Sequence, residues 1–368
     1  MNRWACTASV FALLLSVSLS RSQEVDVYHT LVKSSRVVLL PFLNLSDWPG
    51  LRDEVMQEVR ARLAVRELEL ADPDQTADAL RAARLRNPTE LGVAELHALS
   101  QELAAAYVLT GTIHRFECTP EAAEISLAAR LIYVPELRVE WANSAAYYSG
   151  GAASLFSRNI GGDTARVITR GVRRLMQGFA VGGPGTRRPV VELRGRGRGG
   201  PRDFPCRTLA VVPLANETLT EFGGELVTDQ LYASLFRRGF TLSESGRVRE
   251  VMLAGDDLSR GQASQETLRH LREDLAVDLV LTGTLSSLSS ATATRFGEIP
   301  DVALELRLVD TQTGAVVWSR NYARSGDDSA GLFGTGQAES GAVLARELTQ
   351  DIVRSLRIRR ARPELTTQ

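Results

Sequence analysis

The sequence predicts an α/β protein made of two tandem modules, each a mixed parallel and antiparallel sheet packed with helices, preceded by a signal peptide. Three observations support this prediction. An apolar run at 37–44 recurs at 209–216, and a second run at 107–113 recurs at 279–285. Internal repetition at one constant spacing indicates a repeated structural unit. The chain has 368 residues, enough for about two domains of ordinary size.

The N-terminus is expected to be a Sec signal peptide over residues 1–20. A basic residue precedes an apolar stretch, which ends at the small residues Ser18 and Ser20. The apolar core is shorter than the roughly 20 residues that span a bilayer, which favours cleavage over retention as an anchor. Cys6 precedes the apolar core, so we do not expect a lipoprotein. The predicted location is the periplasm or another exported compartment.

The first module is expected over residues 30–181. It opens with a continuously apolar run at 37–42, as in a strand buried on both faces. A helix follows, because apolar residues recur at helical spacing at Leu51, Val55, Val59 and Leu63. A short strand near 68–71, a helix over about 89–105 and a strand over 107–113 then give βαβ units with a partly parallel sheet.

Two antiparallel strands and a closing helix are expected next in each copy. In the second copy, apolar and polar residues alternate over 302–308, a glycine turn follows at 310–314, and a strand begins at Ala315. The first copy has the same alternation, but its turn at 134–137 lacks the glycine and must be built differently. The closing helices are predicted by apolar positions at Ile168, Val172 and Met176, and at Leu344, Leu348 and Ile352.

The segment between the copies, residues 182–203, is rich in glycine and arginine and is interpreted as a linker before the second module at 204–357. A solvated hinge is the simplest interpretation. The alternative is weak contact between its arginines and an anionic envelope surface. The basic tail at 358–368 is likewise expected to be a frayed helix end, with contact to anionic lipid or polysaccharide as the alternative.

The composition excludes several classes of function. Forty-three Lys and Arg residues against 44 Asp and Glu residues give a net charge of -1, so no overall field attracts nucleic acid. The single lysine, Lys33, precedes the first strand and suits neither a P-loop nor a Schiff base. The four histidines have no metal-ligand spacing. We therefore predict no metal and no cofactor.

Three local patterns resemble enzyme sites and are interpreted otherwise. The glycines of 334–336 lack the third glycine of a dinucleotide loop and are expected to form a helix-entry loop. The acidic pairs at 256–257 and 327–328 have no nearby histidine or cysteine cluster and are expected to be solvated turns. No catalytic, cofactor-binding or metal-binding residue is predicted, and the binding residues are unknown.

The cysteines and two tryptophans are assigned structural roles. After signal cleavage only Cys118 and Cys206 remain. They are either unpaired small hydrophobic residues or a bridge between the two halves, and the sequence leaves both open. Trp141 and Trp318 recur at equivalent positions and are expected to fill the interface between helix and sheet.

The repeated motifs resemble a known envelope module. They are the strand ends Pro41-Phe42 and Pro213-Leu214, each followed closely by Asn, the Val-Leu-Thr-Gly-Thr strands at 108–112 and 280–284, and the hairpin at 308–319. This order is similar to the periplasmic α/β module of three protein types: the curli secretion lipoprotein (CsgG-type), the penicillin-binding-protein activator (LpoB-type) and the amino-terminal domain of TolB. The resemblance implies a non-enzymatic, protein-binding module of the cell envelope.

Two departures limit this resemblance. A curli-type channel needs membrane-inserted hairpins, and the loop at 286–300 is too short and too polar for one. The lipoprotein members carry a lipidated cysteine after the signal, which this chain lacks. We therefore expect an exported protein that binds envelope proteins through its two modules. The alternatives are a small-ligand-binding protein that uses the cleft between the modules, and a hydrolase with an unrecognised site.

Overall fold

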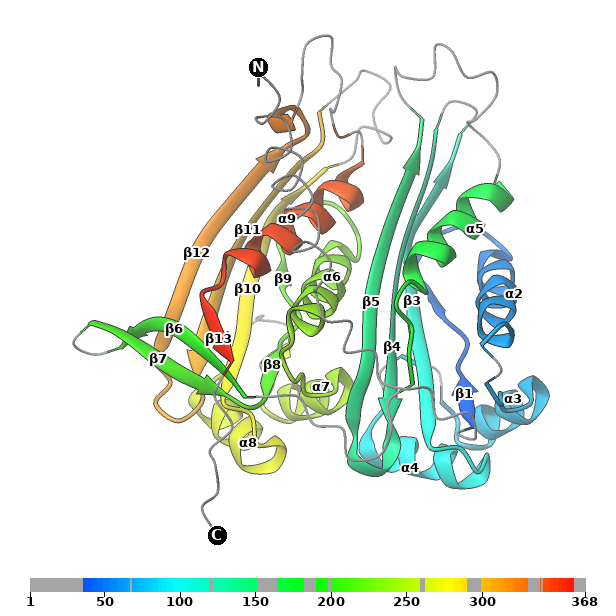
Figure 1. Ribbon diagram of the computed structural model, residues 1–368, viewed down its shortest axis with the longest axis horizontal. Helices are drawn as coiled ribbons and strands as arrows, with labels where there is room; N and C mark the ends of the chain where they lie inside the picture. The colour runs from blue at the N-terminus through cyan, green and yellow to red at the C-terminus, as the bar shows by residue number, and fades with distance from the viewer. Residues whose placement is uncertain are drawn as a thin grey trace, which may run out of the picture.

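The computed structural model contains two modules that lie side by side, each with one main sheet and its helices (Figure 1). The signal segment, the glycines at 334–336 and much of the loop at 286–300 fall outside the residues that the structure describes. The described residues are 36–66, 68–85, 87–89, 91–119, 122–150, 164–181, 190–197, 200–258, 262–289, 299–329, 338 and 340–360.

The sheet of the first module has the strand order β1-β3-β4-β5, with β2 also beside β3. Strands β1 and β2 run parallel to β3, whereas β3, β4 and β5 are antiparallel. Its elements are β1 (Val37–Leu39), β2 (Leu43–Asn44), α2 (Leu51–Ala64), α3 (Pro73–Ala82), α4 (Val93–Glu102), β3 (Tyr107–Cys118), β4 (Ala123–Tyr133), η1 (Val134–Glu136), β5 (Arg138–Ser149) and α5 (Thr164–Leu175).

The second module repeats this order as β8-β10-β11-β12, with β9 beside β10. Its elements are β8 (Leu209–Val211), β9 (Ala215–Asn216), α6 (Gly223–Arg238), α7 (Ser245–Ala254), α8 (Gln265–Leu275), β10 (Leu279–Leu288), β11 (Asp301–Asp310), β12 (Val316–Ser325), η5 (Gly326–Ser329) and α9 (Gly341–Ser355). The register repeats too, because Val37 pairs with Tyr107 and Leu209 pairs with Leu279. The predicted α/β class with mixed sheets is confirmed.

Each sheet buries apolar residues on both faces, which explains the continuous apolar runs of the short parallel strands. In the first module, one face packs against α2 and α5, and part of the other packs against α3 and α4. The second module places α6 and α9 on one face and α7 and α8 on the other. The predicted helix stripe is confirmed, because Leu51, Val55, Val59 and Leu63 are all fully buried.

The Thr-Gly-Thr motifs at 110–112 and 282–284 lie in the middle of β3 and β10, because both strands continue beyond the apolar runs at 107–113 and 279–285. Close backbone approach nevertheless explains the glycines. A Cβ atom at Gly111 would lie 2.5 Å from the ring of Phe42, and one at Gly283 would lie 2.1 Å from the carbonyl oxygen of Glu305. The turn without glycine is a 3-10 helix at 134–136, followed by Leu137 in the left-handed conformation.

The interpretation of 182–203 as an unstructured linker is wrong for its described residues. Strands β6 (Val191–Gly197) and β7 (Gly200–Cys206) form a hairpin, and β13 (Ile358–Arg360) pairs with β6. The chain therefore continues as a strand after α9 ends at Ser355, and not as a frayed helix end. The hairpin is held because Val191, Leu193 and Cys206 are buried in the core of the second module.

Candidate functional site

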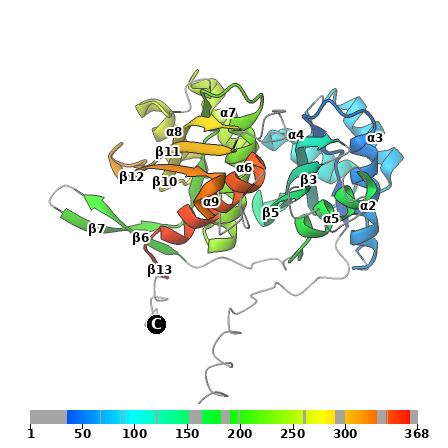
Figure 2. The ribbon, with the colours of Figure 1, turned by 90° about the horizontal axis from the view of Figure 1, so that it is seen from above.

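The two modules dock through the sheet of the first and the helices of the second. Seen from above, α6 and α9 lie against β5 (Figure 2), and α6 also contacts β4. Val139, Ala142 and Ala146 of β5 belong to the same apolar cluster as the core of the second module. The small side chains of Ala142 and Ala146 let α6 and α9 approach β5 closely. The contact between the modules is therefore part of the apolar core of the second module.

Two contacts between titratable side chains cross this interface. The Nε2 atom of His114 on β3 lies 3.0 Å from Oδ2 of Asp229 on α6, and the His114 side chain is only 1% exposed. The Nε atom of Arg130 on β4 lies 3.3 Å from Oε1 of Glu244, which caps α7. Arg130 also donates to the carbonyl oxygen of Thr89. Because Glu244 is 1% exposed, its charge depends on Arg130 for compensation.

The electrostatics of Asp229 reflect this contact. Burial alone would raise its pKa, but the close contact with His114 and the positive charge of Arg130 outweigh burial and lower the pKa below its ordinary value. Asp229 is therefore ionised at neutral pH. A carboxylate held in this state at a module boundary stabilises the docked arrangement above the range where it would be protonated.

A third polar contact crosses from α9. The Nε atom of Arg346 donates to the carbonyl oxygen of Ser144 on β5 at 3.0 Å. Burial, together with the nearby guanidinium groups of Arg237 and Arg174, lowers the pKa of Arg346 to about 10. Arg346 thus remains a cation at neutral pH and holds the two modules together through a charge-assisted hydrogen bond.

A recess with a cavity volume of about 10 Å³, partly open to solvent, lies between the modules. Its lining includes Thr112, Arg130 and Asn143 of the first module and Asp229 and Tyr232 of the second. Drug-sized ligand sites are typically ~300–1,000 Å³. The cleft considered for small-ligand binding is therefore small, and two of its polar side chains, Arg130 and Asp229, already take part in the docking of the modules.

The corresponding sheet face of the second module is not covered. We call it the open face and define it by residues of β10, β11 and β12 that lie 172 or 177 positions after covered residues of the first module. The open face consists of Thr284, Ser286, Ala303, Glu305, Arg307, Ser319, Asn321 and Ala323. Every counterpart in the first module is buried, whereas these eight side chains are exposed or half-buried.

One pair of equivalent arginines illustrates the difference. Arg130 has a side chain that is 10% exposed, whereas its counterpart Arg307 is 43% exposed and pairs with Glu305 on the same strand. Exposed ion pairs contribute little to stability. The Arg307–Glu305 pair lies within one strand, whereas the Arg130–Glu244 pair joins the two modules. The open face is thus exposed or half-buried where the equivalent face of the first module is buried.

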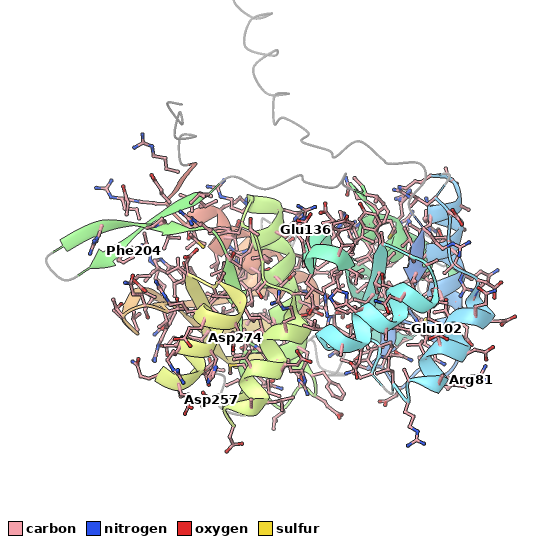
Figure 3. The ribbon with its side chains drawn as sticks, turned by 90° about the horizontal axis from the view of Figure 1, so that it is seen from below. Arg81, Glu102, Glu136, Phe204, Asp257 and Asp274 are labelled. Atoms are coloured by element: carbon pink, nitrogen blue, oxygen red, sulfur yellow. The ribbon has the colours of Figure 1, made fainter. Side chains whose placement is uncertain are left out.

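The acidic pairs are partly corrected. Asp257 is not a solvated turn residue, because it is 2% exposed and accepts hydrogen bonds from the Ser264 amide and the Thr267 hydroxyl. Figure 3 shows it on the underside of the second module. It joins the end of α7 to the start of α8. Asp327 and Asp328 are exposed, and Asp328 accepts a hydrogen bond from the Ser325 amide.

The cysteines and tryptophans have structural positions. Cys118 and Cys206 are both free, and burial first, then the charge of Asp278, raises the pKa of the Cys206 thiol. Trp141 is buried beside the ring of Phe179, as expected of a core residue. Trp318 is half-buried and packs against the core of the second module.

The described residues were also compared with the requirements of metal and membrane sites. Among them, no three His, Cys, Asp or Glu side chains gather closely enough to hold a metal ion. None of the helices within the described ranges is long and apolar enough to cross a bilayer. Sequence reasoning missed the pairing of His114 with Asp229, because only the docking of the modules brings these residues together.

Comparisons with known proteins cover part of the chain. No curated protein matches the chain. Among solved structures, it is similar to a PelC dodecamer subunit from Paraburkholderia phytofirmans, at 21% identity over 40% of this chain and 84% of that chain, with a TM-score of 0.28. It is also similar to lipoprotein GNA1162 from Neisseria meningitidis, at 18% identity over 32% and 84%, with a TM-score of 0.27.

A further similarity is to the LpoB C-terminal domain from Salmonella enterica, at 19% identity over 37% of this chain and 93% of that domain, with a TM-score of 0.26. Residues 189–323 match the family described as "Peptidoglycan-synthase activator LpoB". This match supports the LpoB-type part of the resemblance, and the CsgG and TolB parts remain predictions. The matched range contains the β6–β7 hairpin and the second module as far as Ala323 on β12.

Proposed function

We propose that this chain is an exported, non-enzymatic protein of the cell envelope that binds a partner protein through its second module. The observation that carries the proposal is the match of residues 189–323 to the LpoB family. The matched range contains the β6–β7 hairpin and extends to Ala323 on β12, so it includes all of the open face. The description of the family points to a peptidoglycan synthase as the class of partner.

The arrangement of the modules supports this assignment. The sheet face of the first module is used by the docking of α6 and α9, whereas the open face of the second is exposed or half-buried. A protein that recognises a partner needs a surface that is not buried within its own fold. The second module has such a surface, and the first module supports it from the opposite side of α6 and α9 (Figure 1).

Export completes the proposal. We propose that residues 1–20 direct the chain to the periplasm, that it is not a lipoprotein, and that any attachment to the envelope comes through its partner. The exposed arginines of the hairpin, Arg194 and Arg202, provide the weak contact with an anionic envelope surface that the arginine-rich segment suggested.

The test uses the purified full chain and the peptidoglycan synthases of the organism that encodes it. We expect one synthase to bind the chain in a defined stoichiometry and to polymerise its lipid-linked substrate faster when the chain is added. An unrelated exported protein of similar net charge is the control for non-specific stimulation. If the folded chain neither binds nor stimulates any of the synthases, the proposed partner class is wrong.

A further inference from the structure

Strand β12 is the outer edge of the second sheet. The strand order β12-β11-β10-β8 leaves one side of β12 without a neighbouring strand of its sheet among the described residues, and Figure 1 shows the β6–β7 hairpin crossing its lower end. Ser319, Arg320, Asn321 and Ala323 are exposed. An edge strand presents unpaired backbone groups, which other chains can use for strand pairing.

The hydrogen bonding shows which backbone groups point outward. The amide of Ser325 donates to the Asp328 carboxylate at 2.9 Å, so it points away from β11. Orientation alternates along an antiparallel edge strand, so the backbone groups of Ser319, Asn321 and Ala323 point outward as well. Within the described residues, none of these three has a backbone hydrogen-bond partner on the outward side.

The equivalent edge of the first module is closed. On β5, the Ser144 carbonyl oxygen accepts from Arg346 at 3.0 Å, and the Ala146 carbonyl oxygen accepts from Arg174 at 3.1 Å. The counterparts of Ser144 and Ala146 are Asn321 and Ala323. The same edge is thus capped by arginine side chains in one module and lacks such caps, among the described residues, in the other.

The two ends of β12 are protected, which limits the open part of the edge. At the lower end, the hairpin approaches so closely that a Cβ atom at Gly195 would lie 2.5 Å from the carbonyl oxygen of Val317. At the upper end, the Asp328 carboxylate accepts a hydrogen bond from the Ser325 amide. The accessible edge therefore runs from Ser319 to Ala323, which is long enough to pair with a short extended segment.

The surroundings of this edge are basic, although the whole chain is nearly neutral. Among the residues of β6, β7, β12 and β13 whose side chains the structure describes, five are arginines and two are acidic, and one of the five, Arg324, pairs with Asp351 of α9. These charged residues are Glu192, Arg194, Arg202, Asp203, Arg320, Arg324 and Arg359. An acidic side chain of an incoming segment would meet this excess of positive charge.

We propose that the edge of β12 from Ser319 to Ala323 binds an extended, acidic peptide segment of the partner protein, which adds to the sheet as a further strand. Backbone hydrogen bonds to the outward groups provide the affinity, and the arginines select acidic over basic side chains. This inference rests on the proposed function, since it names the surface and the chemistry by which the partner is recognised.

The experiment uses the full chain and two fluorescein-labelled hexapeptides, one alternating valine with glutamate and the other valine with lysine. Fluorescence anisotropy is expected to show binding of the acidic peptide only. Asn321→Pro removes an outward amide that the sheet does not use, so the strand should persist, but binding should weaken by about tenfold or more. Asn321→Ala keeps the amide and should bind within about twofold of the unsubstituted chain.

Circular dichroism and thermal unfolding verify that each variant is folded. If Asn321→Pro does not fold, Ala323→Pro tests the neighbouring outward amide, and Arg320→Glu tests the charge, which should weaken binding of the acidic peptide. The inference is overturned if neither peptide binds, if both bind equally, or if the folded proline variants bind as well as Asn321→Ala. A synthase that is still bound and stimulated by Asn321→Pro would leave the proposed function standing and refute only the strand addition.

Discussion

Replacing Arg130 with methionine tests whether the buried ion pair holds the modules together. Methionine keeps most of the length of the aliphatic stem, so the substitution removes mainly the guanidinium group. It leaves the carboxylate of Glu244, which is 1% exposed, without its cation and the carbonyl of Thr89 without that donor. Breaking a buried pair by removing one partner costs about 3–5 kcal/mol.

The lower end of this range applies here, because Glu244 still accepts the amide of Arg247 at 3.0 Å. We expect Arg130→Met to lower the free energy of unfolding by about 3 kcal/mol at pH 7. The repeat provides a matched control. Arg307→Met removes the equivalent arginine, whose side chain is 43% exposed, and should cost about 1 kcal/mol or less.

The assay is equilibrium urea unfolding of the full chain, followed by circular dichroism and tryptophan fluorescence. Adding Glu244→Gln to Arg130→Met should recover about 1 kcal/mol or more, because a buried neutral amide costs less than a buried unpaired charge. The reasoning is refuted if the two single arginine variants lose equal stability. If the double variant recovers no stability, the lost free energy of unfolding arises from packing and not from the unpaired charge of Glu244.

Three further predictions concern single side chains. The pKa of Asp229 is lowered in the folded chain, so its contribution to stability is present above the unfolded pKa and is lost as the pH falls through the folded pKa. In urea titrations, the difference in stability between the unsubstituted chain and Asp229→Asn should therefore be largest above about pH 5 and should shrink below pH 3.8. Gly111→Ala should cost about 1–3 kcal/mol in thermal unfolding, because its Cβ would lie 2.5 Å from the Phe42 ring. Iodoacetamide at pH 8 should leave Cys206 unmodified in the folded chain, as peptide mass spectrometry would show, because burial raises the pKa of this thiol.

Much of the fold is predictable because the repeat presents each pattern twice. The buried stripe of α2 and the alternation of β11 follow directly from apolar spacing, which local sequence determines. Short helices are less predictable. Helix α3 begins at Pro73 after Asp72, whose carboxylate accepts the amides of Asp74 and Gln75. The capping residue can be recognised in the sequence, but the apolar pattern of these ten residues is too weak to predict a helix after it.

The β6–β7 hairpin and the interface between the modules were not predicted, for a different reason. Glycine and arginine dominate the β6 segment, so its buried positions, Val191 and Leu193, do not stand out from a solvated linker. They become strand residues because the core of the second module covers them. In the same way, His114 and Asp229 gain their roles only when two modules dock, and tertiary contact of this kind has no local signature.

The two modules place small residues at the same edge positions under opposite circumstances. In the first module, Ser144 and Ala146 must be small because α6 and α9 cover them. In the second, Asn321 and Ala323 are exposed, so packing does not require them to be small. Small residues there keep the backbone of β12 within reach of another chain, which argues that the first module supports the fold while the second presents the edge for recognition.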